Sequence, residues 1–242
     1  MQALLLAAGL GTRLRPLTND RPKALVEVGG MTLLERNLLN LRSQGVVRVV
    51  VNVHHFAEQV EAFLASRSWG MEVIVSDERD QLLDTGGGLS KASRYFVDSM
   101  NIAVHNVDIL SNVRLLDLET EMITTGADAV LAVCKRQTSR YLLFSSDGNL
   151  VGWHNSASGE YLWVNEAISD YKCLAFSGIS LYNPYLVKQL PPADHPYPLI
   201  PALLNLAKNH TIKCLEHPCQ GWLDVGKPET LAEANSFIAR YL

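Results

Sequence analysis

The first 25 residues constrain the fold of this chain more than any other segment. An apolar run, QALLLA at residues 2–7, passes directly into a turn that contains Gly9 and Gly11. A continuous apolar run is typical of a strand buried on both faces, and glycines after it let the backbone approach a ligand closely. Pro16 and Pro22 follow where a phosphate-binding loop would normally wind into a helix. The segment therefore predicts a buried strand, a glycine turn and an extended stretch.

The rest of the first half alternates strand and helix patterns. Thr32 and Glu35 have the spacing of a capping box at the start of a helix that Gly45 ends, and residues 46–53 form a second apolar run. The alternation continues with a helix at about 56–66, the strand MEVIVS at 71–76, a helix at about 88–96 and the strand IAVHN at 102–106. Repeated strand–helix–strand units predict a mostly parallel sheet flanked by helices.

From about residue 128 the pattern changes to closely spaced strands with hairpin signals. The strand segments are ADAVLAVCK at 127–135, YLLFSS at 141–146, LVGWH at 150–154 and CLAFSGISLYN at 173–183, with a turn at 147–149. A closing helix follows Pro228. Because no linker or repeat separates this part from the first, we expect a β-rich elaboration of the same sheet and a single domain over residues 1–242.

Composition narrows the possible partners. The chain has 21 basic and 25 acidic residues and a net charge of −4, which argues against a nucleic-acid binder. No apolar run is long enough to span a bilayer, and Met1 passes into a strand without a cationic leader, so we expect a cytoplasmic protein without membrane contact. The four cysteines lack zinc-site spacing and are expected to be reduced core thiols; they are Cys134, Cys173, Cys214 and Cys219.

The glycine turn does not fit the common nucleotide-binding fingerprints. A dinucleotide-binding loop needs a third glycine where this chain has Leu14, and no Walker sequence occurs anywhere. What remains is a turn whose amides can approach a phosphate, followed by a stretch that carries Arg13 and Lys23. A planar guanidinium and a compact ammonium together suit a triphosphate. The alternative is a plain tight turn flanked by solvated cations.

The complete pattern resembles the sugar-1-phosphate nucleotidyltransferases, which make nucleotide-activated sugars. The segments that carry the resemblance occur in the order typical of that family: LAAGLGTRLRPLT at 6–18, PKAL at 22–25, TGGG at 85–88, NVD at 106–108, FSGI at 176–179 and WLDVG at 222–226. Within the family, the short chain with TGGG and a WLDVG-type ending is most similar to the uridylyltransferases that act on N-acetylmuramate 1-phosphate. Mannose-1-phosphate guanylyltransferases and phosphocholine cytidylyltransferases are the alternatives.

The resemblance implies a Rossmann-like mixed sheet of the nucleotide-diphospho-sugar transferase type, with a nucleotide-binding half at 1–127 and a sugar-binding half with the closing helix at 128–242. It also implies the reaction, in which a nucleoside triphosphate and a sugar 1-phosphate give a nucleotide sugar and pyrophosphate, and a requirement for Mg²⁺. We expect a monomer or a homodimer. A non-catalytic relative that binds nucleotide sugars is the alternative from another class, although all four expected charged site residues are present.

The resemblance also assigns roles to individual residues. Arg13 and Lys23 are expected to be catalytic, and Asp108 and Asp224 to hold the metal. The nucleotide is expected to contact twelve residues: Leu6, Ala7, Ala8, Gly9, Gly11, Thr12, Arg13, Lys23, Thr85, Gly86, Gly87 and Asn106. From the residues alone, Asp108 could instead cap the next segment and Asp224 could form a turn.

The sugar side has a weaker pattern. The resemblance assigns Asn106, Ser177 and Gly178 to the sugar substrate, although Val107 replaces the glycine usual beside that asparagine. The lysine that many relatives supply to the sugar phosphate is absent, and Arg140 is our substitute; a solvated arginine is the alternative. The pair His54-His55 is expected to enter a helix and not to bind metal, and the four tryptophans are expected in the core or at interfaces.

Overall fold

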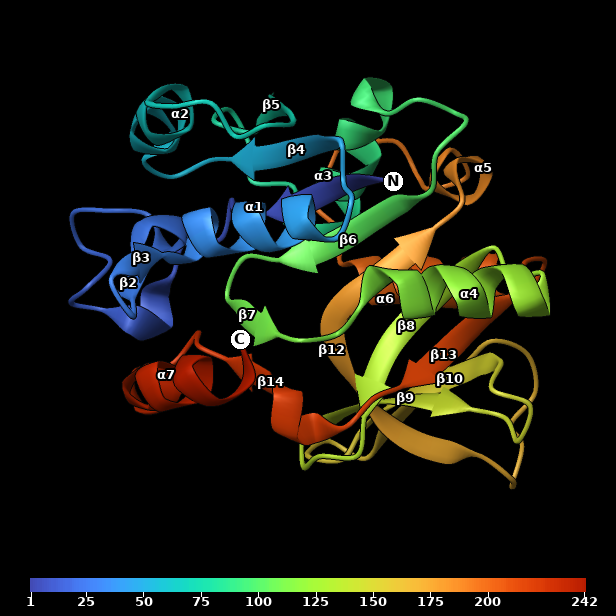
Figure 1. The fold of residues 1–242 in the computed structure, drawn as a ribbon. Helices are drawn as coiled ribbons and strands as arrows, with labels where there is room; N and C mark the ends of the chain where they lie inside the picture. Colours follow the sequence, from blue (N-terminus) through green and yellow to red (C-terminus); the bar gives the residue numbers. More distant parts are fainter.

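A computed structural model describes all residues, 1–242, of the protein. Its main body is a ten-stranded sheet with helices on both faces (Figure 1). Four strands of the amino-terminal half run parallel: β1 (Gln2–Leu6), β4 (Arg48–Val53), β5 (Glu72–Asp77) and β6 (Ile102–Asn106). The mostly parallel, helix-flanked sheet predicted for the first half is therefore confirmed.

The connections of this half are helices and short turns. The helices are α1 (Leu33–Ser43), α2 (Ala57–Ala65), α3 (Asp84–Ala92) and α4 (Leu115–Thr125), with 3-10 turns η1 (Thr12–Leu14), η2 (Lys23–Leu25) and η3 (Ser93–Tyr95) and a hairpin of β2 (Glu27–Val28) and β3 (Met31–Thr32). Thr32 Oγ1 accepts a hydrogen bond from the Glu35 amide at 3.1 Å, so the predicted cap forms. The prediction that a helix starts near residue 88 is wrong, because α3 already begins at Asp84.

The second half extends the same sheet with antiparallel strands. These are β8 (Ala129–Cys134), β9 (Arg140–Phe144), β10 (Leu150–Asn155), β11 (Glu160–Trp163) and β12 (Lys172–Tyr182), and β13 (Ile212–Glu216) pairs parallel with β8. β12 pairs with β6 and so joins the two halves. Two helices, α5 (Pro184–Val187) and α6 (Leu199–Leu206), follow β12; neither these nor α4 was expected from the sequence.

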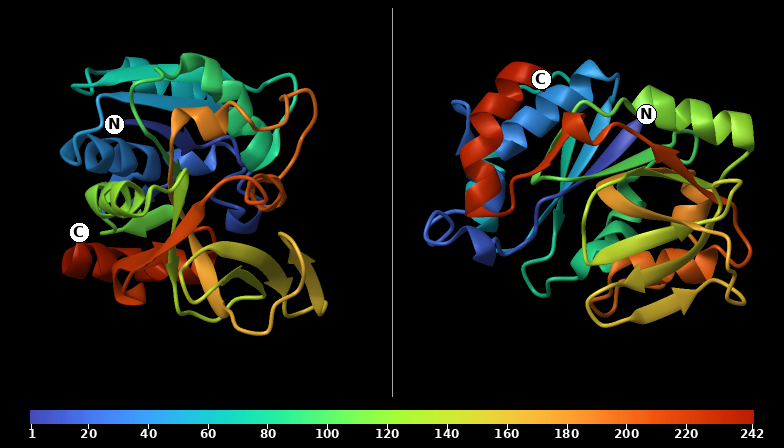
Figure 2. Two further views of the ribbon diagram at one scale, coloured as in Figure 1. Left: turned by 90° about the vertical axis from the view of Figure 1, so that its right-hand side faces the viewer. Right: turned by 90° about the horizontal axis from the view of Figure 1, so that it is seen from below.

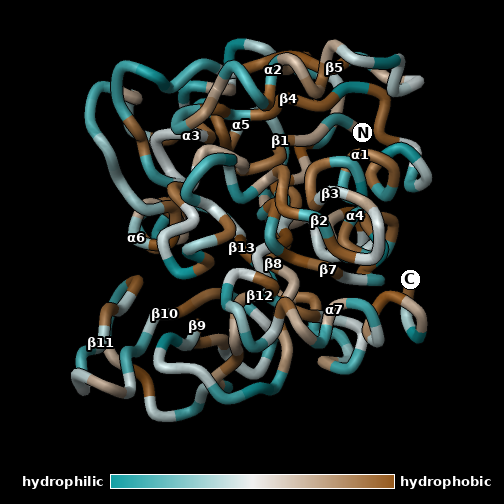
Figure 3. Tube along the Cα trace, turned by 90° about the vertical axis from the view of Figure 1, so that its left-hand side faces the viewer, coloured by the Kyte–Doolittle hydropathy of each residue, from teal (hydrophilic) through white to brown (hydrophobic).

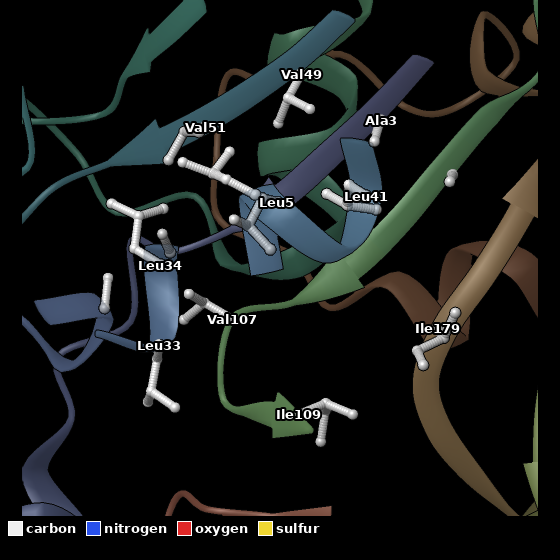
Figure 4. Close-up of a cluster of buried hydrophobic side chains, with 14 of the residues drawn as sticks. Ala3, Leu5, Leu33, Leu34, Leu41, Val49, Val51, Val107, Ile109 and Ile179 are labelled. Atoms are coloured by element: carbon white, nitrogen blue, oxygen red, sulfur yellow. The ribbon is translucent and has the colours of Figure 1, made fainter. Parts of the chain in front are cut away.

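Alternating side chains of the central strands supply two cores. Ala3 and Leu5 of β1 belong to the larger core, together with Leu34 and Leu41 of α1 (Figure 4), whereas Leu4 belongs to the second core on the other face. Apolar residues accordingly lie mostly toward the centre of the molecule, and polar residues lie mostly at its periphery (Figure 3). Because both faces of β1 are covered, its sequence is continuously apolar.

The carboxyl-terminal segment returns to the amino-terminal half. After η4 (Cys219–Gly221), β14 (Trp222–Asp224) pairs with β7 (Ile109–Ser111). The closing helix α7 (Pro228–Tyr241) then packs beside the β2–β3 hairpin (Figure 2), where Asn235 Oδ1 accepts a hydrogen bond from the Gly29 amide at 2.8 Å. This return places Gly226, just after β14, beside Arg13, which follows the first glycine turn. None of the helices has the length and apolar character that crossing a bilayer requires.

Candidate active site

The glycine turn after β1 leaves backbone donors free. None of the amides of Gly9, Leu10 and Gly11 donates a hydrogen bond within the chain, and Gly11 takes a left-handed conformation with φ of 64°. Thr18 Oγ1 donates to the Gly11 carbonyl at 2.9 Å and so fixes the turn. Consecutive free amides on a glycine turn form a concave binding site for an anion.

The two amides before this turn are already satisfied. The buried Asn52, at the carboxyl end of β4, accepts hydrogen bonds from the amides of Ala7 at 2.7 Å and Ala8 at 3.2 Å. Asn52 Nδ2 in turn donates to Glu78 Oε1 at 2.8 Å. Ala7 and Ala8 therefore shape the turn and do not offer their amides to a nucleotide. Asn52 was not among the predicted site residues, although its place at a strand end was a usable signal.

Lys23 and Asp108 form an ion pair at the edge of the sheet. Lys23 Nζ lies 2.7 Å from Asp108 Oδ2, and the two side chains are only 14% and 10% exposed. Lys23 begins η2, and Asp108 lies between β6 and β7, so the pair joins segments 85 residues apart in sequence. An ammonium carries three donors, so Lys23 can hold Asp108 and still reach a phosphate oxygen.

Three of the four predicted charged residues lie close to Gly226. A Cβ built on this glycine would lie 2.8 Å from Arg13 Nη2, 2.8 Å from Asp224 Oδ1 and 2.9 Å from Asp108 Oδ2. The Gly226 amide donates to Asp224 Oδ1 at 2.8 Å, and the Val225 amide donates to the Asp108 carbonyl at 2.9 Å. The structure thus brings Arg13, Lys23, Asp108 and Asp224 together around bare backbone.

The two aspartates fit a magnesium ion. Asp108 Oδ1 and Asp224 Oδ2 accept no hydrogen bond within the chain, and the structure groups no three His, Cys, Asp or Glu side chains into a metal site. Mg²⁺ prefers oxygen ligands, commonly one or two carboxylates completed by waters and substrate phosphates. The paired carboxylates against Gly226 match this donor set.

A pocket of about 390 Å³ opens beside the ion pair. It is lined by predicted residues and by four that were not predicted: Leu6, Ala8, Gly9, Lys23, Thr85, Asn106 and Asp108, then Asn52, Leu82, Asp84 and Pro196. The side chain of Asn106 forms no hydrogen bond, so its amide is free for a ligand. The buried Val107 lies in the core beside Leu33 and Leu34 of α1 (Figure 4) and does not line the pocket.

The second glycine run is packed from within the chain. The amides of Gly86 and Gly87 both donate to the Tyr197 carbonyl, at 3.0 and 3.3 Å, and Thr85 Oγ1 accepts from the Leu199 amide at 3.0 Å. A Cβ on Gly86 would lie 2.4 Å from the Tyr197 ring. These glycines lie inside α3, with their amides already paired, and their assignment to the nucleotide stays a prediction.

The residues predicted to bind the sugar substrate do not all lie at the pocket. Gly178, with φ of 72°, lies at an irregularity in β12, and a Cβ there would lie 2.9 Å from Asn106 Nδ2. Ser177 is fully buried, and its hydroxyl lies 2.8 Å from His217 Nε2. Arg140 is exposed at the start of β9 and does not line the pocket. Of these residues, only Asn106 offers a free polar group to the pocket.

Burial shifts two titratable groups near the pocket. It raises the pKa of Glu78. The hydrogen bonds that the carboxylate accepts from Asn52 and from the Leu83 amide act in the opposite direction but are outweighed. Burial also lowers the pKa of His105, on β6, to about 4, so this imidazole is neutral at physiological pH. Both are groups of the structural layer under the pocket and not of its lining.

The cysteines, the tryptophans and the His54-His55 pair do not line the pocket. All four cysteines are unpaired. Cys134 is buried and the half-buried Cys214 packs against the second core, so the expectation of core thiols is wrong for Cys173 and Cys219. Trp69 is buried, and Trp222 carries the Arg136 guanidinium 4.2 Å above its ring. The pair His54-His55 directly precedes Phe56, the N-cap of α2, as expected.

With this geometry in place, the class of the protein is defined: the chain belongs to the MobA-like NTP transferase domain family, which matches residues 3–175, and is a sugar-1-phosphate nucleotidyltransferase. It is 34% identical to the N-acetylmuramate alpha-1-phosphate uridylyltransferase of Caulobacter vibrioides, over 98% of this chain and 96% of that protein. It is 27% identical to the enzyme of the same name from Neisseria meningitidis, over the full length of both. The fold resembles crystal structures of HddC from Yersinia pseudotuberculosis, with a TM-score of 0.76, 20% identity and coverage of 98% and 99% of the two chains.

Proposed function

We propose that this protein transfers the uridylyl group of UTP to N-acetylmuramate 1-phosphate, giving UDP-N-acetylmuramate and pyrophosphate. Two relatives that match nearly the whole chain carry that activity in their names, and both are covered almost completely by this chain. A mannose-1-phosphate guanyltransferase from Schizosaccharomyces pombe is 28% identical, a value between those of the two uridylyltransferases, but this chain spans only 62% of its length. The length match therefore favours the uridylyltransferases.

One observation carries the catalytic part of the proposal: Arg13, Asp108 and Asp224 meet at Gly226, and Lys23 is paired with Asp108. Two cations, two carboxylates and a turn with free amides are what a polyphosphate needs for charge neutralisation. A carboxylate pair alone would repel phosphate, so its presence beside the cations supports a role for a divalent metal.

The reaction needs little beyond positioning. A sugar phosphate loses its second proton near pH 6, at a pKa of about 6, so its oxygen can attack the α-phosphorus without a general base. Lys23, Arg13 and the free amides of Gly9 to Gly11 would hold the phosphates in line and disperse their charge. Magnesium, when held by Asp108 and Asp224, supplies further neutralisation of the leaving pyrophosphate. His105 is buried and neutral and is not used as a base.

On the sugar side, we assign the free amide of Asn106 to the substrate and Gly178 to the close packing that places it. A glycine is required at 178, because any side chain there would press on Asn106. Ser177, bonded to His217, would act through β12 and not by direct contact. Arg140 is exposed at the start of β9 and does not line the pocket, so we give it no role in holding the substrate.

A crossed panel of nucleotides and phosphorylated acceptors tests the proposal. Purified protein with Mg²⁺ is incubated with each of the four nucleoside triphosphates and with N-acetylmuramate, mannose, glucose and N-acetylglucosamine 1-phosphates or phosphocholine, and pyrophosphate release is measured. We expect the highest kcat/KM with UTP and N-acetylmuramate 1-phosphate. Turnover of GTP with mannose 1-phosphate, or of CTP with phosphocholine, would replace the substrate assignment. No turnover with any pair would favour a non-catalytic binding protein.

A further inference from the structure

One wall of the pocket is not used by the phosphate chemistry. Lys23, Asp108 and Gly9 account for the phosphates, but Leu82, Asp84 and Pro196 also line the same cavity. Leu82 and Pro196 are apolar, and Asp84 is the one charged residue among the three. A nucleotide whose phosphates lie at Lys23 therefore leaves this wall for its ribose and base.

The backbone of Asp84 is held in an unusual conformation. Its φ is 60°, and only Phe56 shares a positive φ among the non-glycine residues. Asp84 Oδ1 accepts a hydrogen bond from the Thr85 amide at 2.6 Å, which orients the carboxylate. Asp84 forms no ion pair, so Oδ2 is left without a partner in the chain. Strained backbone of this kind persists where the surroundings enforce it, and it concentrates at functional sites.

The loop before Asp84 is fixed from two sides. Glu78 Oε2 accepts a hydrogen bond from the Leu83 amide at 3.1 Å, and the Leu83 carbonyl accepts one from the Tyr197 amide at 3.1 Å. Glu78 is fully buried and is itself bonded to Asn52 beneath the glycine turn. The position of Asp84 is thus set by the same network that sets the phosphate-binding turn.

From this arrangement we infer that Asp84 selects the base of the nucleotide: its free carboxylate oxygen accepts a hydrogen bond from a ring N–H, which admits uracil and guanine and excludes cytosine and adenine. The inference rests on the proposed function, because it needs a nucleotide in this pocket. A carboxylate can only accept hydrogen bonds. Uracil N3 and guanine N1 carry hydrogens, whereas cytosine N3 and adenine N1 carry lone pairs that would face the carboxylate and repel it.

Equilibrium binding of nucleotides tests the inference without turnover. Isothermal titration calorimetry with Mg²⁺ gives the Kd of UTP, GTP, CTP and ATP for the unmodified protein, for Asp84→Asn and for Asp84→Gly. Asparagine can donate to cytosine N3, and glycine removes the carboxylate while suiting a positive φ. Loss of one charge-assisted hydrogen bond corresponds to about a 10- to 100-fold change in Kd. We expect the preference for UTP over CTP to fall by that factor in both variants.

Asp80→Asn is the matched control, since Asp80 lies in the same loop, is exposed and does not line the pocket. It should keep the unmodified ratio of UTP to CTP affinity. An unchanged ratio in a folded Asp84→Asn protein would overturn the inference, as would equal binding, or no binding, of all four nucleotides by the unmodified protein. If UTP binds selectively but no sugar phosphate is consumed, the proposed reaction fails while the assignment of Asp84 stands.

Discussion

The two glycine-rich segments beside the pocket have opposite environments. In the first, the amides of Gly9 and Gly11 have no partner in the chain. In the second, the amides of Gly86 and Gly87 are bonded to the Tyr197 carbonyl, and the tyrosine ring occupies the space that a side chain on Gly86 would need. One segment is open to an anion, and the other is filled by the chain itself.

This difference shows that glycine content alone does not define a phosphate-binding loop. Glycine permits close approach of any group to the backbone, whether a ligand or another part of the protein. What distinguishes the two cases is whether the amides are already satisfied, because a buried donor is nearly always paired. The first segment should therefore control activity and the second should control stability.

The largest expected effect tests the charged partners of the first segment. Asp224→Asn keeps an oxygen to accept the Gly226 amide but removes the negative charge beside Asp108 and Arg13. Loss of one such electrostatic contact lowers kcat by about 10²- to 10³-fold. Pyrophosphate release gives the rate, and thermal unfolding should show a Tm close to that of the unmodified protein. Asp117→Asn, a half-exposed residue on the first turn of α4, is the control and should keep full activity. Equal rates for the two variants would remove Asp224 from the site.

Gly86→Ala tests the second segment. The added methyl group would lie 2.4 Å from the Tyr197 ring and 2.9 Å from its carbonyl oxygen, so the segment around Tyr197 must move. Overpacking of this kind costs about 3 kcal/mol of the free energy of unfolding. Urea unfolding measures the loss, and the rate per folded molecule should change much less than in Asp224→Asn. A stable variant with abolished nucleotide binding would show instead that this glycine contacts the ligand.

Gly9→Ala makes the same chemical change in the first segment, with a smaller expected effect. A methyl group at this position meets only the end of Lys23, with Nζ 3.7 Å away, and the φ of Gly9 is not left-handed. The free energy of unfolding should therefore stay within about 0.5 kcal/mol. The methyl group would occupy space between the turn and Lys23, so kcat/KM should fall about 10-fold. Comparison with Gly86→Ala is the control, and a loss of stability without loss of activity would contradict the distinction between the two segments.

The sequence predicted the parts of the site that depend on local order. Asp108 follows a strand whose apolar run is unmistakable, and the carboxyl ends of parallel strands meet at one edge, so its position beside Lys23 could be foreseen. The capped helix α1 was predictable for a similar reason, because Thr32 and Glu35 lie within one turn. These are short-range patterns that a few neighbouring residues define.

Other features depend on contacts between distant segments. Tyr197 lies 111 residues after Gly86, and nothing in the local TGGG pattern reveals that a carbonyl from so far along the chain takes up its amides. Asn52 Oδ1 accepts a hydrogen bond from the Ala7 amide, 45 residues earlier in the sequence. The Ser177 hydroxyl forms a hydrogen bond with His217 Nε2, 40 residues later. The exposure of Cys173 follows from its place near the start of β12, which its apolar neighbours in sequence conceal.

Glu78 joins the two segments, and its titration provides the smallest expected effect. Its carboxylate bonds to Asn52, which holds the Ala7 and Ala8 amides, and to the Leu83 amide before the second segment. Lys91 and His54 also face it and favour the charged form, but burial outweighs them and raises the pKa above the ordinary value of 4.5. The folded state therefore binds this proton more tightly than the unfolded state does.

It follows that the contribution of Glu78 to the free energy of unfolding is greatest below pH 4.5 and falls as pH rises through the raised pKa. The loss grows with the difference between the folded-state and unfolded-state pKa of Glu78. Urea unfolding of the unmodified protein and of Glu78→Gln, measured from pH 4 upward, isolates the contribution of Glu78 as the difference between the two free-energy curves. The difference should change with pH in that window and become constant above it, whereas Glu229→Gln, exposed on the first turn of α7, should give a constant offset. A pH-independent difference for Glu78→Gln would mean that the buried carboxylate is as well stabilised as in water, and that the link between the two glycine segments carries no cost of charge burial.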